Sequence, residues 1–283
     1  MGKRFGILKQ KRKEPQATLD LGYEKAYQIE TPESCGVRIG KLHGIGKRNK
    51  QQDAFGISDL KEEVIESKGI LAILADGMGG LSDGEKASMA TVISCLNYFE
   101  THDMDEETPV HFVDMVENAN REVKEVLGSA SGSSGSTLAA VLVRGGKIFW
   151  VSVGDSRIFL YRDGGLTQIS KDHNYAAQLL EMAEAGEVDA EEALNDPQRN
   201  ALTSYIGIRV LEKIDYNEKA LKAECGDRIL LLSDGVYNSV TEEEIIESME
   251  LPLGRAMMRL GMQVEEKRKR NQDNYTAIVL EIE

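Results

Sequence analysis

Five aspartates stand where strongly apolar stretches begin or end, and these carboxylates could hold metal ions. They are Asp53 before "AFGI", Asp76 after "ILA", Asp155 after "FWVSVG", Asp234 after "RILLLS" and Asp273 before "NYTAIVL". Strands this apolar are buried, so carboxylates at their ends are partly desolvated and repel one another. Clustered acids of this kind are usually neutralised by cations, and oxygen ligands favour Mg²⁺ or Mn²⁺ over zinc. The pattern predicts a site for divalent cations.

Glycine adjoins three of these acids, in Asp76-Gly77, Gly154-Asp155 and Asp234-Gly235. Each pair alone is typical of a turn, and we keep that interpretation for Asp163-Gly164. Beside a metal ligand, however, glycine lets a backbone carbonyl join the coordination without steric conflict. The glycines therefore strengthen the metal hypothesis when the acids are considered together.

The elements that must position these acids are recognisable as apolar runs. The runs are "DAFGISDL", "GILAILAD", "STLAAVLV", "KIFWVSVGD", "RIFLYRDG", "RILLLSDG" and "YTAIVLEIE". "VRGGKIFW", with Gly145-Gly146 as its turn, and "YRDGGLTQI" predict adjacent hairpins, and hence an antiparallel sheet rather than repeated βαβ units. Helical patterns cover 84–101, 109–127, 174–195 and 252–270. We predict a single α+β catalytic domain over 31–283, after a basic, flexible tail over 1–30.

Composition narrows the class of protein further. The chain has 283 residues, of which 41% are hydrophobic and 29% charged, as in a soluble globular protein. Its net charge of −14 argues against nucleic acid as a partner, and the absence of an 18-residue apolar run argues against a transmembrane segment. Three cysteines without metal-like spacing (Cys35, Cys95 and Cys225) favour a reduced, cytoplasmic setting. The histidines have no paired spacing; we expect His43 to be at the surface or partly buried, and His173 to make a structural hydrogen bond.

Several motifs, taken in order, resemble one family. "GKRNKQQDA" (46–54), "DGMGG" (76–80), "GDSR" (154–157), "SDG" (233–235) and "DN" (273–274) are similar to the motifs of the type 2C, metal-dependent Ser/Thr protein phosphatases. The likeness runs from about residue 36 to the C-terminus, and Met78, where eukaryotic members have His, is typical of bacterial members. The resemblance implies a four-layer α-β-β-α sandwich, with two central antiparallel sheets flanked by helix pairs.

The resemblance also implies a role for each acid, with two Mn²⁺ or Mg²⁺ ions in the active site. Asp76 would bridge both ions, and Gly77 would lend its carbonyl to one of them. Asp234 and Asp273 would complete the shell of the first ion, and Asp53 would hold the second through bound water. Asp155 would help to place a third ion, which bacterial members are able to bind.

The implied reaction is hydrolysis of phosphoserine and phosphothreonine by a metal-bridging hydroxide that attacks phosphorus directly. Arg48 would grip the phosphate, and we count Arg48, Asp76 and Asp155 as catalytic. Because Met78 cannot serve as an acid, our hypothesis is that a metal-bound water near Asp155 protonates the leaving oxygen. Two further departures, Gln52 and Asn238 where many members have acids, remove no expected direct ligand of the two central ions.

The resulting interpretation is a cytoplasmic signalling phosphatase, monomeric, with phosphoproteins as substrates and a cognate Ser/Thr kinase as partner. Two alternatives stay open. A non-catalytic family member that binds phosphoproteins would have lost metal ligands, yet none is missing. A two-metal hydrolase of small phosphate esters would need a base-binding stretch that is not evident. A cysteine-dependent phosphatase would need Arg six residues after its Cys, where this chain has Lys41, Thr101 and Leu231.

Overall fold

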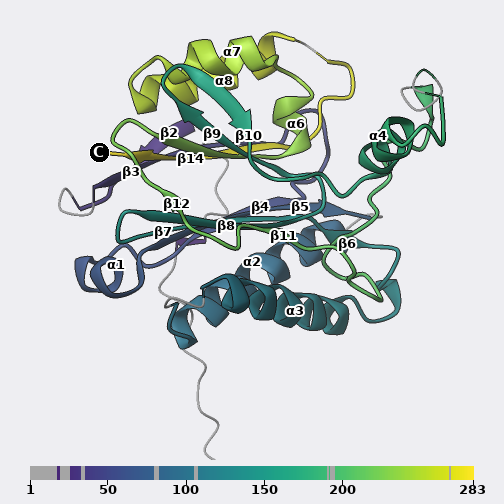
Figure 1. The fold of residues 1–283 in the computed structure, drawn as a ribbon, viewed down its shortest axis with the longest axis horizontal. Coiled ribbons are helices and arrows are strands. Elements are labelled where there is room, and N and C mark those ends of the chain that lie inside the picture. Colours follow the sequence, from purple (N-terminus) through teal and green to yellow (C-terminus); the bar gives the residue numbers. More distant parts are fainter. Residues whose placement is uncertain are drawn as a thin grey trace, which may run out of the picture.

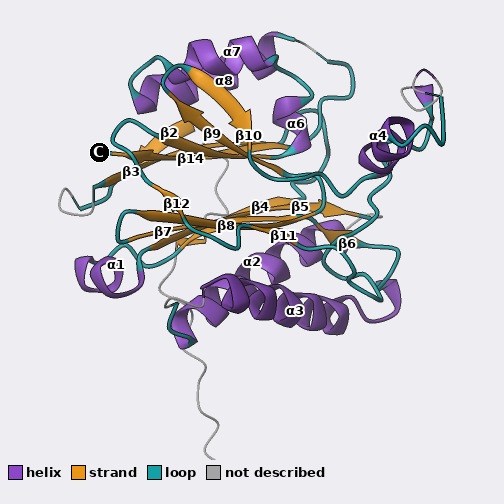
Figure 2. Ribbon diagram, viewed as in Figure 1, coloured by secondary structure: helices purple, strands orange, loops and turns teal. Residues whose placement is uncertain are grey.

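The described chain folds into four layers, in which two antiparallel sheets lie face to face and helices cover both outer faces (Figure 1). The computed structural model describes residues 18–19, 26–32, 36–79, 83–104, 108–189, 191, 195–267 and 269–283. Figure 2 shows the same layers by secondary structure, with both sheets between the helices. The expected α+β four-layer sandwich is confirmed. Cys35, Gly80 and the basic residues up to position 13 lie outside the described residues.

The first sheet has the strand order β1-β4-β5-β7-β8-β11, with β6 beside β5 and β12 beside β8. Its strands are β1 (Thr18–Leu19), β4 (Asp53–Ile57), β5 (Ile70–Met78), β6 (Gly135–Ser136), β7 (Leu138–Arg144), β8 (Lys147–Val153), β11 (Asp215–Tyr216) and β12 (Leu221–Lys222). The helices α2 (Asp83–Thr101) and α3 (Thr108–Leu127) pack on its outer face and bury Phe99, Phe112 and Met115. The short helix α1 (Glu62–Lys68) connects β4 to β5.

The second sheet has the order β10-β9-β13-β14-β3-β2. Its strands are β2 (Ala26–Ile29), β3 (Val37–Gly44), β9 (Arg157–Arg162), β10 (Gly165–Gln168), β13 (Arg228–Leu232) and β14 (Tyr275–Ile282). The outer face is covered by α7 (Glu242–Met249) and α8 (Leu253–Glu266), while α6 (Asp234–Tyr237) follows β13 directly. Between the sheets, Phe55, Leu74 and Ile278 belong to an apolar core. The helix α4 (Tyr175–Glu184) projects from the body of the sandwich (Figure 1).

The apolar runs all lie on strands, and both predicted hairpins form. At Gly145-Gly146 and at Asp163-Gly164 both turn residues have positive φ, as a two-residue hairpin turn requires. The helical region predicted over 174–195 is interrupted, because α4 stops at Glu184 and Gly186 follows with φ +75°; residues 191 and 195 are helical again. The edge strands β1 and β2 lie within the stretch expected to be a tail. Among the described residues, no helix is long and apolar enough to cross a bilayer.

Strand direction brings the acids to one end of the sandwich. Asp53 at the start of β4 is the cross-strand partner of Asp76 near the end of β5. In the other sheet, Asp234 follows the end of β13 and Asp273 precedes the start of its antiparallel neighbour β14.

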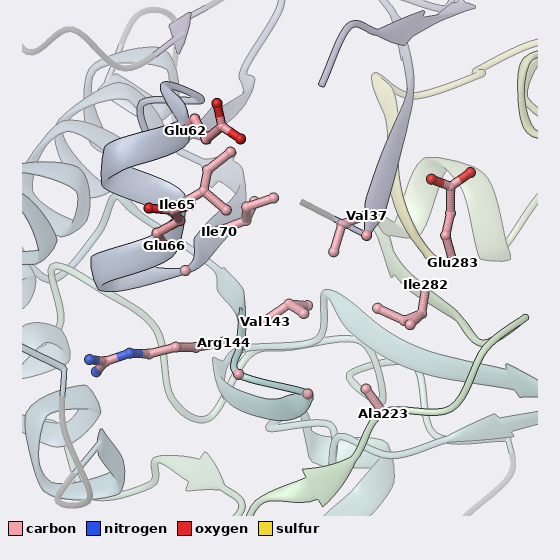
Figure 3. A pocket seen from close by; sticks show the side chains of 14 residues that line it. Val37, Glu62, Ile65, Glu66, Ile70, Val143, Arg144, Ala223, Ile282 and Glu283 are labelled. Carbon is pink, nitrogen blue, oxygen red and sulfur yellow. The ribbon is translucent and has the colours of Figure 1, made fainter. Parts of the chain in front are cut away.

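A hollow of about 380 Å³ occupies the opposite strand ends (Figure 3). Val37, Ile70, Val143 and Ile282 line it, with Glu62 of α1 at its edge. None of the five predicted acids lines this hollow. The chemistry expected from the sequence therefore lies at the other end of the molecule.

Candidate metal centre and active site

Asp53 and Asp76 face each other across the first sheet. Asp53 is 5% exposed and its Oδ2 accepts hydrogen bonds from the hydroxyls of Ser233 (3.0 Å) and Thr276 (2.6 Å). Its other carboxylate oxygen, Oδ1, is buried without a hydrogen-bond partner. A buried carboxylate oxygen left unpaired is costly, so this oxygen is suited to bind a cation.

The backbone of Asp76 is held by the segment that enters β7. The Asp76 N–H donates to the Thr137 hydroxyl (2.8 Å), and the Asp76 carbonyl accepts from the Thr137 N–H (2.8 Å) and the Ser136 hydroxyl (3.1 Å). Because the backbone is fixed on both sides, the Asp76 carboxylate is presented from a rigid strand. Gly77 follows in close contact with the first turn of α2, where a Cβ would overlap the carbonyl oxygen of Gly84.

Asp234 and Asp273 are brought together by close backbone packing. Gly235 lies against the start of β14 so tightly that a Cβ would overlap the carbonyl oxygen of Asn274. The Asn274 side chain then ties this strand to the loop before β4, donating to the carbonyls of Ile45 (2.9 Å) and Lys50 (3.0 Å). The glycine of the "SDG" motif and the Asn of "DN" thus position the acids beside them.

Arg48 lies at the mouth of the site, and its Nη2 donates to Asp273 Oδ2 at 2.5 Å. About half of the Arg48 side chain is exposed, as is over a third of Asp273. We expect Arg48 to grip phosphate; in this structure its guanidinium pairs with one of the acids, Asp273. No local sequence pattern indicates an ion pair between residues 225 positions apart.

Asp155 lies where the chain passes from β8 in the first sheet to β9 in the second. Its carbonyl accepts a hydrogen bond from the Tyr237 hydroxyl (2.9 Å). Arg157 lies 3.9 Å over the Tyr237 ring and forms a two-pronged ion pair with Asp172 (2.8–3.2 Å). This network fixes the loop that carries Asp155.

The structure tests the expectations for two histidines, His173 and His43. The Nδ1 atom of His173 accepts a hydrogen bond from the Gly154 N–H (3.2 Å), so the expected structural bond is confirmed. Burial, with Lys213 nearby, lowers the pKa of His173 to about 4, which keeps this nitrogen free to accept. His43, in contrast, is only 4% exposed and its Nδ1 lies 2.9 Å from the Thr276 hydroxyl, so it is buried more deeply than the surface or partly buried position that we expected.

The acids raise one another's pKa. Burial, followed by repulsion from Asp234 and Asp273, raises the pKa of Asp53 to about 7. Burial and then Asp53 raise the pKa of Asp76 well above its usual range, and burial with Asp234 raises the pKa of Asp155 to about 7. The carboxyls of Asp234 and Asp76 lie close enough to hydrogen bond to each other. Such a site has excess negative charge that divalent cations would neutralise.

The donor set fits Mn²⁺ or Mg²⁺. It consists of carboxylates from both sheets, with no thiol among them, and one of its oxygens is buried and unpaired. Within the described ranges, no three Asp, Glu, His or Cys side chains lie as close to one another as the ligands of a bound metal ion do. Asp53, Asp76, Asp234 and Asp273 nonetheless form an acidic end of the sandwich, to which both sheets contribute.

Comparison with known proteins shows similarity to protein phosphatases. The protein phosphatase 2C family matches residues 40–272. A Streptococcus pneumoniae protein phosphatase, PhpP, is 33% identical over 223 residues, which cover 77% of this chain and 87% of that protein. The Mycobacterium tuberculosis serine/threonine protein phosphatase PstP is 34% identical over 195 residues, or 68% of this chain. That alignment spans only 36% of PstP.

Among solved structures, the catalytic domain of the serine/threonine protein phosphatase PstP in complex with two manganese ions is similar in fold. Its TM-score is 0.67 at 28% sequence identity, and the match covers 87% of this chain and 98% of that one.

Proposed function

The chain belongs to the protein phosphatase 2C family, and we propose that it is a metal-dependent protein phosphatase that hydrolyses phosphoserine and phosphothreonine. One observation carries the proposal. Carboxylates from two different sheets converge at one end of the sandwich, and the most buried of them, Asp53, has an oxygen with no partner. An acidic protein with an anionic substrate requires positive charge at its site, and bound cations supply it.

We assign the metal ligands as the family resemblance suggests. Asp76, the cross-strand partner of Asp53, would serve both ions, with the Gly77 carbonyl at one of them. Asp234 and Asp273 would complete the site of the first ion, and Asp53 would hold the second through bound water. When bound, two Mn²⁺ or Mg²⁺ ions supply an activated water and neutralise phosphate charge. Asp155, on the loop between the sheets, would help to place a third ion.

Arg48 orients the substrate. Its guanidinium carries several donors in a planar fork, which matches two oxygens of a phosphate. The guanidinium pairs with Asp273 at the mouth of the site, and about half of the Arg48 side chain is exposed, so a phosphate would have access to its free donors.

Phosphoproteins are the proposed substrates, and a Ser/Thr kinase with the same targets is the proposed opposing enzyme. We further propose a monomer that works in the cytoplasm. The retained set of acids together with Arg48 favours catalysis over simple phosphoprotein binding, since a binding protein has no need of paired cations.

The proposal is tested with a phosphothreonine peptide and Mn²⁺, with and without chelator. We expect turnover that chelator abolishes, and a loss of at least 100-fold in Asp76→Asn and Asp234→Asn, because each removes a charge from a shared site (about 3 kcal/mol). Asp163→Asn, at an exposed hairpin turn, is the matched control and should retain full activity. A parallel assay with a nucleotide as substrate distinguishes a protein phosphatase from a hydrolase of small phosphate esters, which would turn over the nucleotide faster than the peptide. Full activity in chelator, or Mn²⁺ binding without any turnover, would overturn the proposal.

A further inference from the structure

The environment of Asp53 contains a feature that the metal site alone does not explain. Two hydroxyls reach this carboxylate from the opposite sheet: Ser233 directly after β13 and Thr276 in β14. Both residues are fully buried. Their contact with Asp53 of β4 is therefore a polar bridge between the sheets, at the edge of an otherwise apolar interior.

The direction of each hydrogen bond follows from its neighbours. The Thr276 N–H donates to Ser233 Oγ (2.9 Å), so this hydroxyl receives one bond and has its own hydrogen left for Asp53. The Thr276 hydroxyl lies between Asp53 Oδ2 (2.6 Å) and His43 Nδ1 (2.9 Å). When Asp53 binds a cation it is ionised and only accepts, so Thr276 donates to Asp53 and accepts from the His43 tautomer that carries its hydrogen on Nδ1.

Both hydroxyls donate to the same oxygen, Oδ2, while Oδ1 receives none. Two donors occupy the lone pairs that one carboxylate oxygen offers in its plane. The bridge therefore fixes the rotation of the carboxylate and leaves a defined oxygen for an additional partner. If the hydroxyls only compensated a buried charge, there would be no reason for both to converge on one oxygen.

We propose that Ser233 and Thr276 are positioning residues, which hold Asp53 so that Oδ1 faces the cation, with His43 orienting the Thr276 hydroxyl. The inference rests on the proposed function only in taking the cation to be Mn²⁺ or Mg²⁺. Outer hydrogen bonds of this kind typically change metal affinity by 10- to 100-fold.

The test measures Mn²⁺ binding directly, from the loss of the free-ion EPR signal on titration into chelator-treated, full-length protein at pH 8. Thr276→Val keeps the shape of the side chain and removes its hydroxyl, whereas Thr276→Ser keeps the hydroxyl. We expect Thr276→Val to weaken Mn²⁺ binding by about 10-fold or more, and Thr276→Ser to restore it to within about threefold of the wild type.

Thr91→Val is the matched control, since Thr91 is equally buried but its hydroxyl bonds only within α2, to the Ala87 carbonyl. It should bind Mn²⁺ like the wild type. Ser233→Ala gives a second, independent removal of one donor in case Thr276→Val does not fold. His43→Leu should weaken Mn²⁺ binding by less than Thr276→Val or Ser233→Ala does, because His43 reaches Asp53 only through its hydrogen bond with Thr276.

The proposal is overturned if Thr276→Val or Ser233→Ala folds and binds Mn²⁺ as tightly as the wild type. It is also overturned if Thr276→Ser is as weak as Thr276→Val, or if Thr91→Val is equally impaired. Its failure is distinguishable from failure of the proposed function. A wild-type protein that binds Mn²⁺ but hydrolyses no phosphopeptide refutes the phosphatase and leaves the positioning test intact.

Discussion

Replacing Asp53 by Asn should stabilise the metal-free protein, although Asp53 is part of the proposed active site. Burial raises the pKa of Asp53 from 3.8 to about 7, so the folded state favours the protonated acid. The cost of ionisation is absent below pH 3.8 and fully present above pH 7. At pH 8 it is about 4 kcal/mol, from a shift of roughly three units at 1.36 kcal/mol each.

Asparagine removes this cost and keeps an oxygen that can accept from Ser233 and Thr276. Its amide nitrogen replaces the unpaired Oδ1 and, without a partner, costs about 1–3 kcal/mol. The net gain is about 1–3 kcal/mol, or an increase of roughly 3–10 °C in the melting temperature. Mn²⁺ should cancel most of this lead or reverse it, since only the carboxylate binds the ion well; saturation at 100 times Kd stabilises the wild type by about 2.7 kcal/mol.

The assay is thermal unfolding of both proteins at pH 8, in chelator and in Mn²⁺, with exposed Asp163→Asn as control. We expect Asp53→Asn to melt above the wild type in chelator and to gain little from Mn²⁺. The reasoning is refuted if Asp53→Asn melts below the wild type in chelator, or if Mn²⁺ raises its melting temperature as much as that of the wild type.

Four further predictions concern other parts of the site. The melting temperature of chelated wild-type protein should fall as pH rises from 5 to 8, because the raised pKa of Asp53 makes folding bind protons; a flat profile contradicts this. Arg48→Ala should lower kcat/KM for a phosphopeptide about 10- to 100-fold, with wild-type Mn²⁺ affinity or tighter; weaker Mn²⁺ binding would mean that Arg48 supports the metal site. Asn274→Ala should destabilise the protein by about 2–3 kcal/mol in urea unfolding, since two backbone carbonyls lose their donor; an unchanged midpoint would refute that role. Asp155→Ala should slow phosphoserine turnover more than aryl phosphate turnover, because an aryl leaving group needs no proton, and equal losses would defeat the hypothesis.

The positions of the acids could be predicted because each adjoins an apolar run whose strand assignment was clear. Antiparallel order then places the ends of neighbouring strands together, as Asp53 and Asp76 illustrate. The strand β3 was not among the predicted runs, because Lys41 and His43 interrupt its apolar pattern. Both are nonetheless buried, with the Lys41 amine 4.9 Å from the Phe55 ring centre.

The positioning contacts could not be predicted in the same way. A hydroxyl beside a strand end is common, and nothing in "SDG" or "NYTAIV" indicates that Ser233 and Thr276 share one oxygen of Asp53. That convergence depends on the distance between the two sheets, which no local pattern encodes. The pairing of Arg48 with Asp273 is likewise a product of tertiary structure and of the local excess of negative charge.

The central claim is that Asp53, Asp76, Asp234 and Asp273 enclose a pair of divalent ions. Anomalous diffraction at the manganese edge, from crystals grown with Mn²⁺, tests it most directly. We expect two strong peaks that share the Asp76 carboxylate, with Asp234, Asp273 and the Gly77 carbonyl around one and Asp53 beside the other. Crystals that contain Mn²⁺ only at surface acids, with these four side chains no closer than before, would contradict the account.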